Sequence, residues 1–204
     1  MRQSASYAVA KRLLDVIASA VGLVVLTPIF IAIAVLIKRD DAGPAIYRRE
    51  IVGLAGRRVY AYKFRTMIQD ADGYLQRHPE LQKEYATNVK LRRDPRVTRI
   101  GAKLRRSSLD ELPQLLNVVR GEMSLVGPRM IHPSEQTRYG AFAQARQTVR
   151  PGITGLWQVR GRQEVSYEVR IQLDDEYLRR RSFWLDLQIL ARTVGVLLRR
   201  YGAY

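Results

Sequence analysis

The sequence predicts an α+β fold that is mostly helical, and three observations lead to this prediction. Uncharged, largely apolar residues fill 16–37. Two strand-like segments flank a turn at 53–56, and two further helices are expected at 166–181 and 182–200, the second with apolar residues at helical spacing. At 204 residues the chain fits one domain of ordinary size. We therefore expect an N-terminal membrane helix, a small β-hairpin and amphipathic interface helices.

The composition is strongly basic and lacks cysteine. Lys and Arg number 35 against 19 Asp and Glu, which gives a net charge of +16. This charge suits nucleic acid, anionic lipid or phosphorylated substrates and does not choose among them. Without cysteine the chain has neither disulfides nor thiolate metal sites. His78 and His132 do not have metal-binding spacing.

The apolar run at 16–37 is long enough to cross a bilayer. As a straight helix its 22 residues would extend roughly 33 Å. A cleaved signal peptide would have a shorter apolar region and a cleavage site, which we do not find. A buried core helix of this length would carry a polar stripe. The run therefore predicts a membrane-associated helix.

Two features argue against a straight crossing. Thr27-Pro28 falls in the middle of the run, where proline kinks a helix. Lys11-Arg12 and Lys38-Arg39 flank both ends, so the positive-inside rule gives no orientation for a span. A bent helix that enters and leaves on one face satisfies both observations. From the residues alone an ordinary transmembrane helix also stays open, because spanning helices tolerate proline.

Strands are expected at 45–49 and 58–67, on either side of the turn at 53–56. Alternation along the second strand points Lys63 and Arg65 in the same direction. Such a pair is either a solvated strand face or a place where phosphate charge is neutralised.

The stretch from 104 to 130 holds the candidate chemistry. Asp110 and Glu111 are adjacent, and Ser108 precedes Glu111 at the spacing of a capping box, which predicts a helix start supported by Pro113. Two first-turn acids can simply stabilise a helix dipole. Arginines before them and a Gly-Pro-Arg loop after them suggest an anion site instead, in which a divalent cation would join carboxylate to phosphate.

The remaining segments complete the helical prediction. A peripheral helical excursion interrupted at His78-Pro79 is expected over 70–88, and a helix over 133–149. Trp157 and Gln158 in the glycine-rich loop at 150–159 would either contact a donor nucleotide or anchor the loop. The basic amphipathic helix at 182–200 would lie in a membrane interface or pack on the core.

Five segments together resemble the bacterial sugar transferase family, the monotopic phosphoglycosyl transferases of envelope glycan assembly. The central match is LRRSSLDELPQLLNV at 104–118, followed by MSLVGPR at 123–129. KFRTM at 63–67, DPRVTRIG at 94–101 and RPGITGLWQV at 150–159 extend the match. The similarity covers nearly the whole chain and is greatest to the hexose-transferring branch.

The resemblance implies an organisation and a reaction. Residues 1–40 would form a re-entrant membrane helix hairpin, and 41–204 a compact catalytic domain on the cytoplasmic face of the bacterial inner membrane, in contact with phospholipid. A hexose 1-phosphate would pass from a UDP-sugar, galactose or glucose, to polyprenyl (undecaprenyl) phosphate with release of UMP. This is the initiating step of exopolysaccharide, capsule or O-antigen synthesis.

The resemblance also implies roles for individual residues. Asp110 would attack the β-phosphorus to form a covalent aspartyl phosphosugar, and Glu111 would bind Mg²⁺. The re-entrant helix would break at Thr27 and Pro28. The substrate-binding residues would be Lys63, Arg65, Arg105, Arg129 and Gln158.

The chain departs from the family pattern at two places. Relatives usually have Q-x-R-x-G where this chain has Arg49-Glu50-Ile51-Val52-Gly53. If the missing arginine holds lipid phosphate in relatives, Arg48 or Arg49 must replace it. Met130 stands where a proline usually follows Arg129, which leaves the positioning of Arg129 and the donor uridine open.

Two functions from other classes are alternatives for a basic, membrane-associated chain. A basic, membrane-anchored nucleic-acid-binding protein needs no Asp-Glu pair, and we find no zinc finger, helix-turn-helix or RNA-binding aromatic motif, so no nucleic-acid partner is expected. A membrane scaffold without catalysis is the other alternative. The sequence is compatible with a homodimer.

Overall fold

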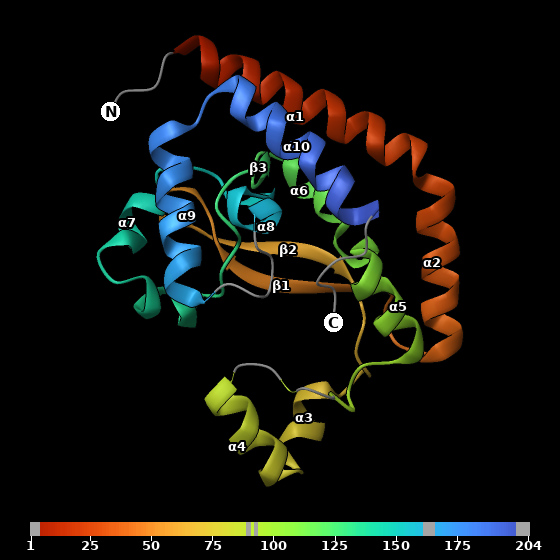
Figure 1. Cartoon of the computed structure of the whole chain (residues 1–204). Coiled ribbons are helices and arrows are strands. Elements are labelled where there is room, and N and C mark those ends of the chain that lie inside the picture. Colours follow the sequence, from red (N-terminus) through yellow and green to blue (C-terminus); the bar gives the residue numbers. More distant parts are fainter. Residues whose placement is uncertain (1–4, 89–90, 92–93, 161–165, 199–204) are drawn as a thin grey trace.

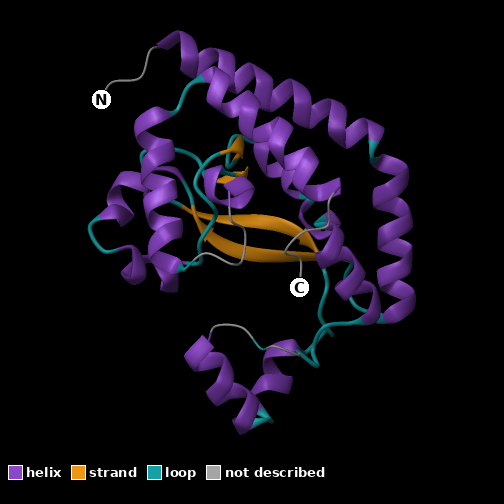
Figure 2. Cartoon of the chain, viewed as in Figure 1, coloured by secondary structure: helices purple, strands orange, loops and turns teal. Residues whose placement is uncertain are grey.

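The computed structural model describes residues 5–88, 91, 94–160 and 166–198. Within these ranges helices dominate and surround a two-stranded hairpin, as the sequence predicts (Figures 1 and 2). Helix α1 (Ala5–Val25) lies along one side of the molecule, and α2 (Thr27–Asp40) turns down an adjacent side (Figure 1).

The predicted break at Thr27-Pro28 is confirmed. The axes of α1 and α2 differ by 61° across Leu26. Pro28 has no N–H to continue the helical ladder, and the Thr27 hydroxyl donates to the carbonyl of Leu23 at 2.8 Å. Within the described ranges no single helix is long and apolar enough to cross a bilayer, whereas the bent pair together reaches that length and composition.

Helix α1 turns a polar face toward the protein. Tyr7, Lys11, Asp15 and Ser19 recur every four residues, and the last two are buried. The opposite face exposes large apolar side chains, among them Leu13, Ile17, Val21 and Val24. This orientation is the reverse of that in an ordinary surface helix, whose apolar face covers the core.

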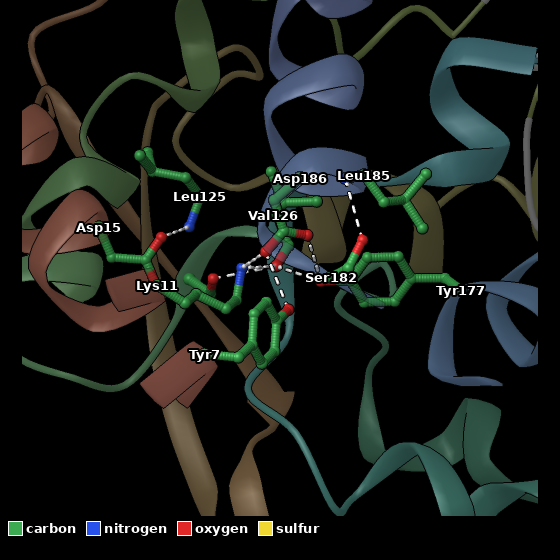
Figure 3. Close-up of polar contacts among 10 residues, drawn as sticks. Tyr7, Lys11, Asp15, Leu125, Val126, Tyr177, Ser182, Leu185 and Asp186 are labelled. Atoms are coloured by element: carbon green, nitrogen blue, oxygen red, sulfur yellow. Dashed lines mark hydrogen bonds and ion pairs between the residues drawn. The ribbon is translucent and has the colours of Figure 1, made fainter. Parts of the chain in front are cut away.

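A buried polar network connects this face of α1 to the rest of the chain (Figure 3). Asp186 accepts hydrogen bonds from Tyr7 at 2.9 Å, Lys11 at 2.9 Å and Tyr177 at 2.8 Å. Lys11 also donates to the carbonyl of Val126 at 2.9 Å. The network therefore joins three segments that lie far apart in the sequence.

The predicted hairpin is confirmed with shifted ends. Strand β1 (Ile46–Val52) pairs antiparallel with β2 (Arg58–Phe64). The first strand extends further than 45–49 and the second ends before 67. The connecting turn contains Ala55 and Gly56 at positive φ, 54° and 73°. One face of the hairpin packs on the core.

Two short helices form an arm that projects away from the other elements (Figure 1). They are α3 (Ala71–Gln76), which Asp70 caps through the backbone N–H of Gly73, and α4 (Pro79–Asn88). The predicted excursion with a break at His78-Pro79 is confirmed.

The predicted capping box at Ser108 is wrong. Helix α5 (Arg99–Ser107) ends there, because Ser108 adopts a left-handed conformation with φ 56° and makes no side-chain cap. A single 3₁₀ turn, Leu109–Glu111, follows, and α6 (Gln114–Val119) begins only after Pro113. The acid pair therefore lies in the turn between two helices.

The predicted single helix over 133–149 is also wrong. A 3₁₀ segment (Pro133–Tyr139) and α7 (Phe142–Arg146) are separated by Gly140, whose φ of 48° interrupts a helix. This segment links β3 (Ser124–Val126) to β4 (Gly152–Thr154), which pair in parallel.

The last helices are α8 (Leu156–Arg160), α9 (Tyr167–Arg180) and α10 (Phe183–Leu198). The two long helices are confirmed; the predicted extension of the second to residue 200 falls outside the described residues. Helix α10 packs Ile189 into a core cluster with Val126, Leu156 and Tyr177. Its other side exposes Trp184, at 73%, and Val194. It therefore packs on the core and also presents an apolar outer face.

Candidate active site

The two adjacent acids meet a lysine from the hairpin. Lys63 near the end of β2 places its Nζ 2.6 Å from Oε1 of Glu111, and both side chains are mostly buried. Asp110 lies beside this ion pair in the same 3₁₀ turn. The backbone N–H of Glu111 bonds to the carbonyl of Ser108 at 3.2 Å, which fixes the turn.

The environment moves the pKa values of the two acids in opposite directions. Burial raises the pKa of Asp110 to about 6, against the opposing charges of Lys63 and Arg105. Burial also favours the neutral form of Glu111, but the charges of Lys63 and Arg129 and the hydrogen bond from Lys63 together lower the pKa of that carboxyl. Glu111 is therefore a fixed negative charge, and Asp110 is the more basic of the two.

Arg105 approaches the acids from α5. Its Nε donates to the hydroxyl of Thr66 at 2.8 Å, and burial lowers the pKa of the guanidinium, although its ordinary value is so high that it stays charged. Gly101, one turn earlier, lets α5 pack closely, because a Cβ there would lie 2.0 Å from the carbonyl oxygen of Thr66. Thr66 therefore packs against α5 at Gly101 and also orients Arg105.

Arg129 reaches the site from the loop after β3. The loop needs glycine at position 127, because a Cβ would lie 2.7 Å from the carbonyl oxygen of Arg150 and 2.9 Å from the nitrogen of Gly152. The guanidinium of Arg129 lies 5.4 Å from the ring centre of Trp157.

Trp157 is an anchor for this loop. It is 4% exposed, and the guanidinium of Arg170 also lies over its ring, at 4.8 Å. Two cations and this burial leave the ring little room to stack on a nucleotide. Of the two interpretations, the contacts therefore favour anchoring, and they give Trp157 the further role of supporting Arg129.

The other two predicted substrate-binding residues have partners elsewhere. Arg65 donates to the carbonyl of Asp41 at 2.5 Å, next to the end of α2. The amide of Gln158 donates to the carbonyl of Ile153 at 2.9 Å. Neither side chain contacts the acid pair within the described ranges. Their roles in substrate binding stay predictions.

The two departures from the family pattern lie in one apolar cluster. Ile51 and Met130 are both buried and pack with Ala61, Val118 and Met123. Position 51 therefore contributes core packing in this chain and no charge.

Sequence reasoning assigned no supporting role to Thr66 or Arg170. Thr66 lies inside the KFRTM motif, which indicates that this position belongs near the site. The motif does not indicate that Thr66 bonds to Arg105. Arg170 lies in α9, where Arg179 and Arg180 make exposed ion pairs. Nothing in the spacing of these arginines indicates that Arg170 instead contacts Trp157.

The acid pair fits a magnesium ion that is bound jointly with a substrate. The described residues contain no group of three His, Cys, Asp or Glu side chains that could hold a metal alone. Mg²⁺ commonly takes one or two carboxylates and completes its shell with phosphate oxygens and water. Glu111 offers one such carboxylate, next to Asp110.

Comparison with known proteins gives a consistent result. Residues 6–200 match the model of a family described as "Bacterial sugar transferase". A UDP-galactose-lipid carrier transferase of Erwinia amylovora is 43% identical over 198 residues, 95% of this chain. The chain spans only 41% of the length of that relative.

Two other relatives are closer in length. The exopolysaccharide production protein ExoY of Rhizobium meliloti is 42% identical over 96% of this chain and 88% of its own. A UDP-glucose:undecaprenyl-phosphate glucose-1-phosphate transferase of Caulobacter vibrioides is 42% identical over 95% of this chain and 72% of its own.

Proposed function

The chain belongs to the bacterial sugar transferase family, and from this premise we propose that it transfers a hexose 1-phosphate from a UDP-sugar to polyprenyl phosphate and releases UMP. The single observation that carries the proposal is the acid pair: two adjacent carboxylates with opposite pKa shifts, among three cations. The names of relatives favour UDP-galactose or UDP-glucose as the donor and undecaprenyl phosphate as the acceptor.

In the first step a carboxylate oxygen of Asp110 attacks the β-phosphorus of the donor. The new phosphorus–oxygen bond forms as the bond to the bridging oxygen breaks, and that oxygen leaves as part of UMP. Asp110 suits this role because its raised pKa makes it the more nucleophilic of the two acids. Lys63, Arg105 and Arg129 stabilise the negative charge that develops on the phosphate oxygens.

In the second step an oxygen of the lipid phosphate attacks the same phosphorus. The bond to Asp110 breaks and returns the carboxylate, and the product is a polyprenyl diphosphate hexose. A bound Mg²⁺ would neutralise diphosphate charge and so reduce its repulsion of Asp110. Glu111, charged and fixed by Lys63, would hold that ion.

The bent helix pair supports a re-entrant membrane segment at the cytoplasmic face of the bacterial inner membrane. Helices α1 and α2 expose apolar side chains outward, and Lys11-Arg12 and Lys38-Arg39 flank the apolar run 16–37 within the pair. The exposed Trp184 of α10 would lie at the same interface. In this proposal the site for a soluble nucleotide sugar would lie next to the bilayer that holds its lipid acceptor.

Pro28→Ala is expected to shift the helix pair toward a spanning conformation, because it restores the missing backbone donor. The chain has no cysteine, so Ala5→Cys at the start of α1 provides a single label. We expect a membrane-impermeant maleimide added outside spheroplasts to label more of the Pro28→Ala protein. Pro44→Ala, outside the pair, serves as control. An unchanged, inaccessible label would rule out proline as the cause of the bend.

The rate of the first step is expected to rise with pH up to about 6, since Asp110 must be charged to attack. Below that value each pH unit should lower the single-turnover rate of UMP release about tenfold. UMP release measured without lipid phosphate isolates this step, because the donor diphosphate does not titrate in this range. A profile that stays flat through pH 6 would contradict the assignment.

The direct test of the proposed function is UMP release from UDP-galactose and UDP-glucose in the presence of Mg²⁺ and a short polyprenyl phosphate. We expect release with at least one donor, dependent on the lipid for multiple turnovers. No release with any UDP-hexose, from a folded protein in a lipid environment, would overturn the proposal.

A further inference from the structure

Arg49 shares a face of the hairpin with Lys63. In the register of β1 and β2, Arg49 is opposite Ala61 and Tyr47 is opposite Lys63. Cross-strand partners share a face, and every second residue returns to it. Arg49 and Lys63 are therefore diagonal neighbours, which typically lie about 7–8 Å apart, with their Cβ atoms somewhat closer.

Glu135 ties Arg49 to the segment that follows Arg129. Oε1 of Glu135 accepts from Nη2 of Arg49 at 3.0 Å and from the backbone N–H of His132 at 2.9 Å. The adjacent backbone N–H of Val52 bonds to the carbonyl of Ile131 at 3.0 Å. The Arg49 side chain is thus held between the hairpin and the loop that carries Arg129.

The charge of Arg49 acts on Glu111. Burial raises the pKa of that carboxyl, and Arg49 adds to the larger effects of Lys63 and Arg129, which lower it. The side chain is 33% exposed, so water or a ligand can reach it. A guanidinium has five donors, and among the described residues Arg49 uses one hydrogen bond, to Glu135. Donors therefore remain for a ligand oxygen.

We infer that Arg49 binds a phosphate oxygen of a substrate beside Lys63, as a fourth cation of the active site. The inference rests on the proposed function, since it assumes that a phosphorylated substrate occupies the site. The group recognised is a phosphate, which either the nucleotide donor or the lipid acceptor supplies. Arg49 would act by contacting the substrate directly.

The test is equilibrium binding to the full chain in detergent, in EDTA so that no adduct forms, with UMP and a UDP-hexose as donor probes and a short polyprenyl phosphate as acceptor probe. Arg49→Gln removes the charge and keeps a polar side chain. We expect its Kd for the donor probes, or for the lipid probe, to rise about tenfold or more, as for loss of a hydrogen bond between charged groups. The ligand affected identifies which phosphate Arg49 contacts.

Arg58→Gln is the matched control. Arg58 belongs to the same hairpin, pairs with Glu50 on the opposite face and is largely exposed. Unchanged Kd values in Arg49→Gln for both classes of ligand, equal to those of Arg58→Gln, would overturn the inference.

Glu135→Gln separates binding from a structural role. It keeps the cation and removes the ion pair, so phosphate binding should stay within about threefold of the wild type. A loss in Glu135→Gln equal to that in Arg49→Gln would mean that the ion pair alone matters and would overturn the inference. The proposed function fails separately, if the wild-type protein releases no UMP.

Discussion

Asp110→Asn is expected to abolish the covalent adduct and to lower turnover by at least about a thousandfold, as the loss of a nucleophile commonly does. Incubation of the wild-type protein with UDP-hexose and no lipid should increase its mass by one hexose phosphate. The Asn variant should show no increase.

Two controls sharpen this experiment. Asp175→Asn removes an acid of α9 that pairs with Arg179 on the surface, and it should form the adduct normally. Glu111→Gln should slow adduct formation and weaken its dependence on Mg²⁺. An active Asp110→Asn enzyme, or a wild-type protein whose mass never changes under conditions of turnover, would defeat the assignment of Asp110 as nucleophile.

The Asp110→Asn variant should also be more stable than the wild type at neutral pH. The pKa of Asp110 is raised from 3.8 to about 6, so the folded state favours the neutral carboxyl. Stability is therefore lost as pH rises from 3.8 through 6, by at most about 3 kcal/mol for a shift of this size. Asn avoids that cost above pH 6, and its advantage should vanish below 3.8, where the aspartate is protonated in both states.

Asp186→Ala is expected to cost about 3–5 kcal/mol of unfolding free energy, the range measured when one partner of a buried ion pair is removed. Lys11 would keep a charge with only the Val126 carbonyl as acceptor, and Tyr7 and Tyr177 would lose an acceptor. Thermal or denaturant unfolding in detergent measures the effect.

Glu176→Ala is the matched control, because it removes two exposed ion pairs, with Arg160 and Arg180, that are worth little. The double variant Lys11→Met, Asp186→Leu should recover part of the loss, since it leaves no unpaired charge. If Asp186→Ala unfolds like the wild type, the network in Figure 3 does not stabilise the fold.

The elements that the sequence predicted well have local causes. The bend at Thr27-Pro28 follows from one missing donor, and the hairpin follows from alternation around a glycine turn. The acid pair and Lys63 were found because they lie in contiguous motifs. The ion pair between Lys63 and Glu111 confirms that the two motifs lie together in the fold, although neither motif indicates the distance between these side chains.

The predictions that failed depended on context. Ser108 has the spacing of a capping box, but the packing of α5 on Thr66 and the tight turn after it place the serine at a helix end. Asp186 and Lys11, which bond in the buried network, lie 175 positions apart in the sequence. No pattern within a short stretch of sequence indicates so distant a pair. The support of Arg129 by Trp157 depends in the same way on tertiary contact.

The inward polar face of α1 has a consequence for protein engineering. Deleting the N-terminal helices to obtain a water-soluble enzyme would strip partners from the Val126 carbonyl, from Asp186 and from the backbone N–H of Leu125, which donates to Asp15 at 3.0 Å. All three lie close to the loop that carries Arg129. A solubilised form should instead keep α1 and replace its outward apolar side chains, such as Ile17 and Val21, with polar ones.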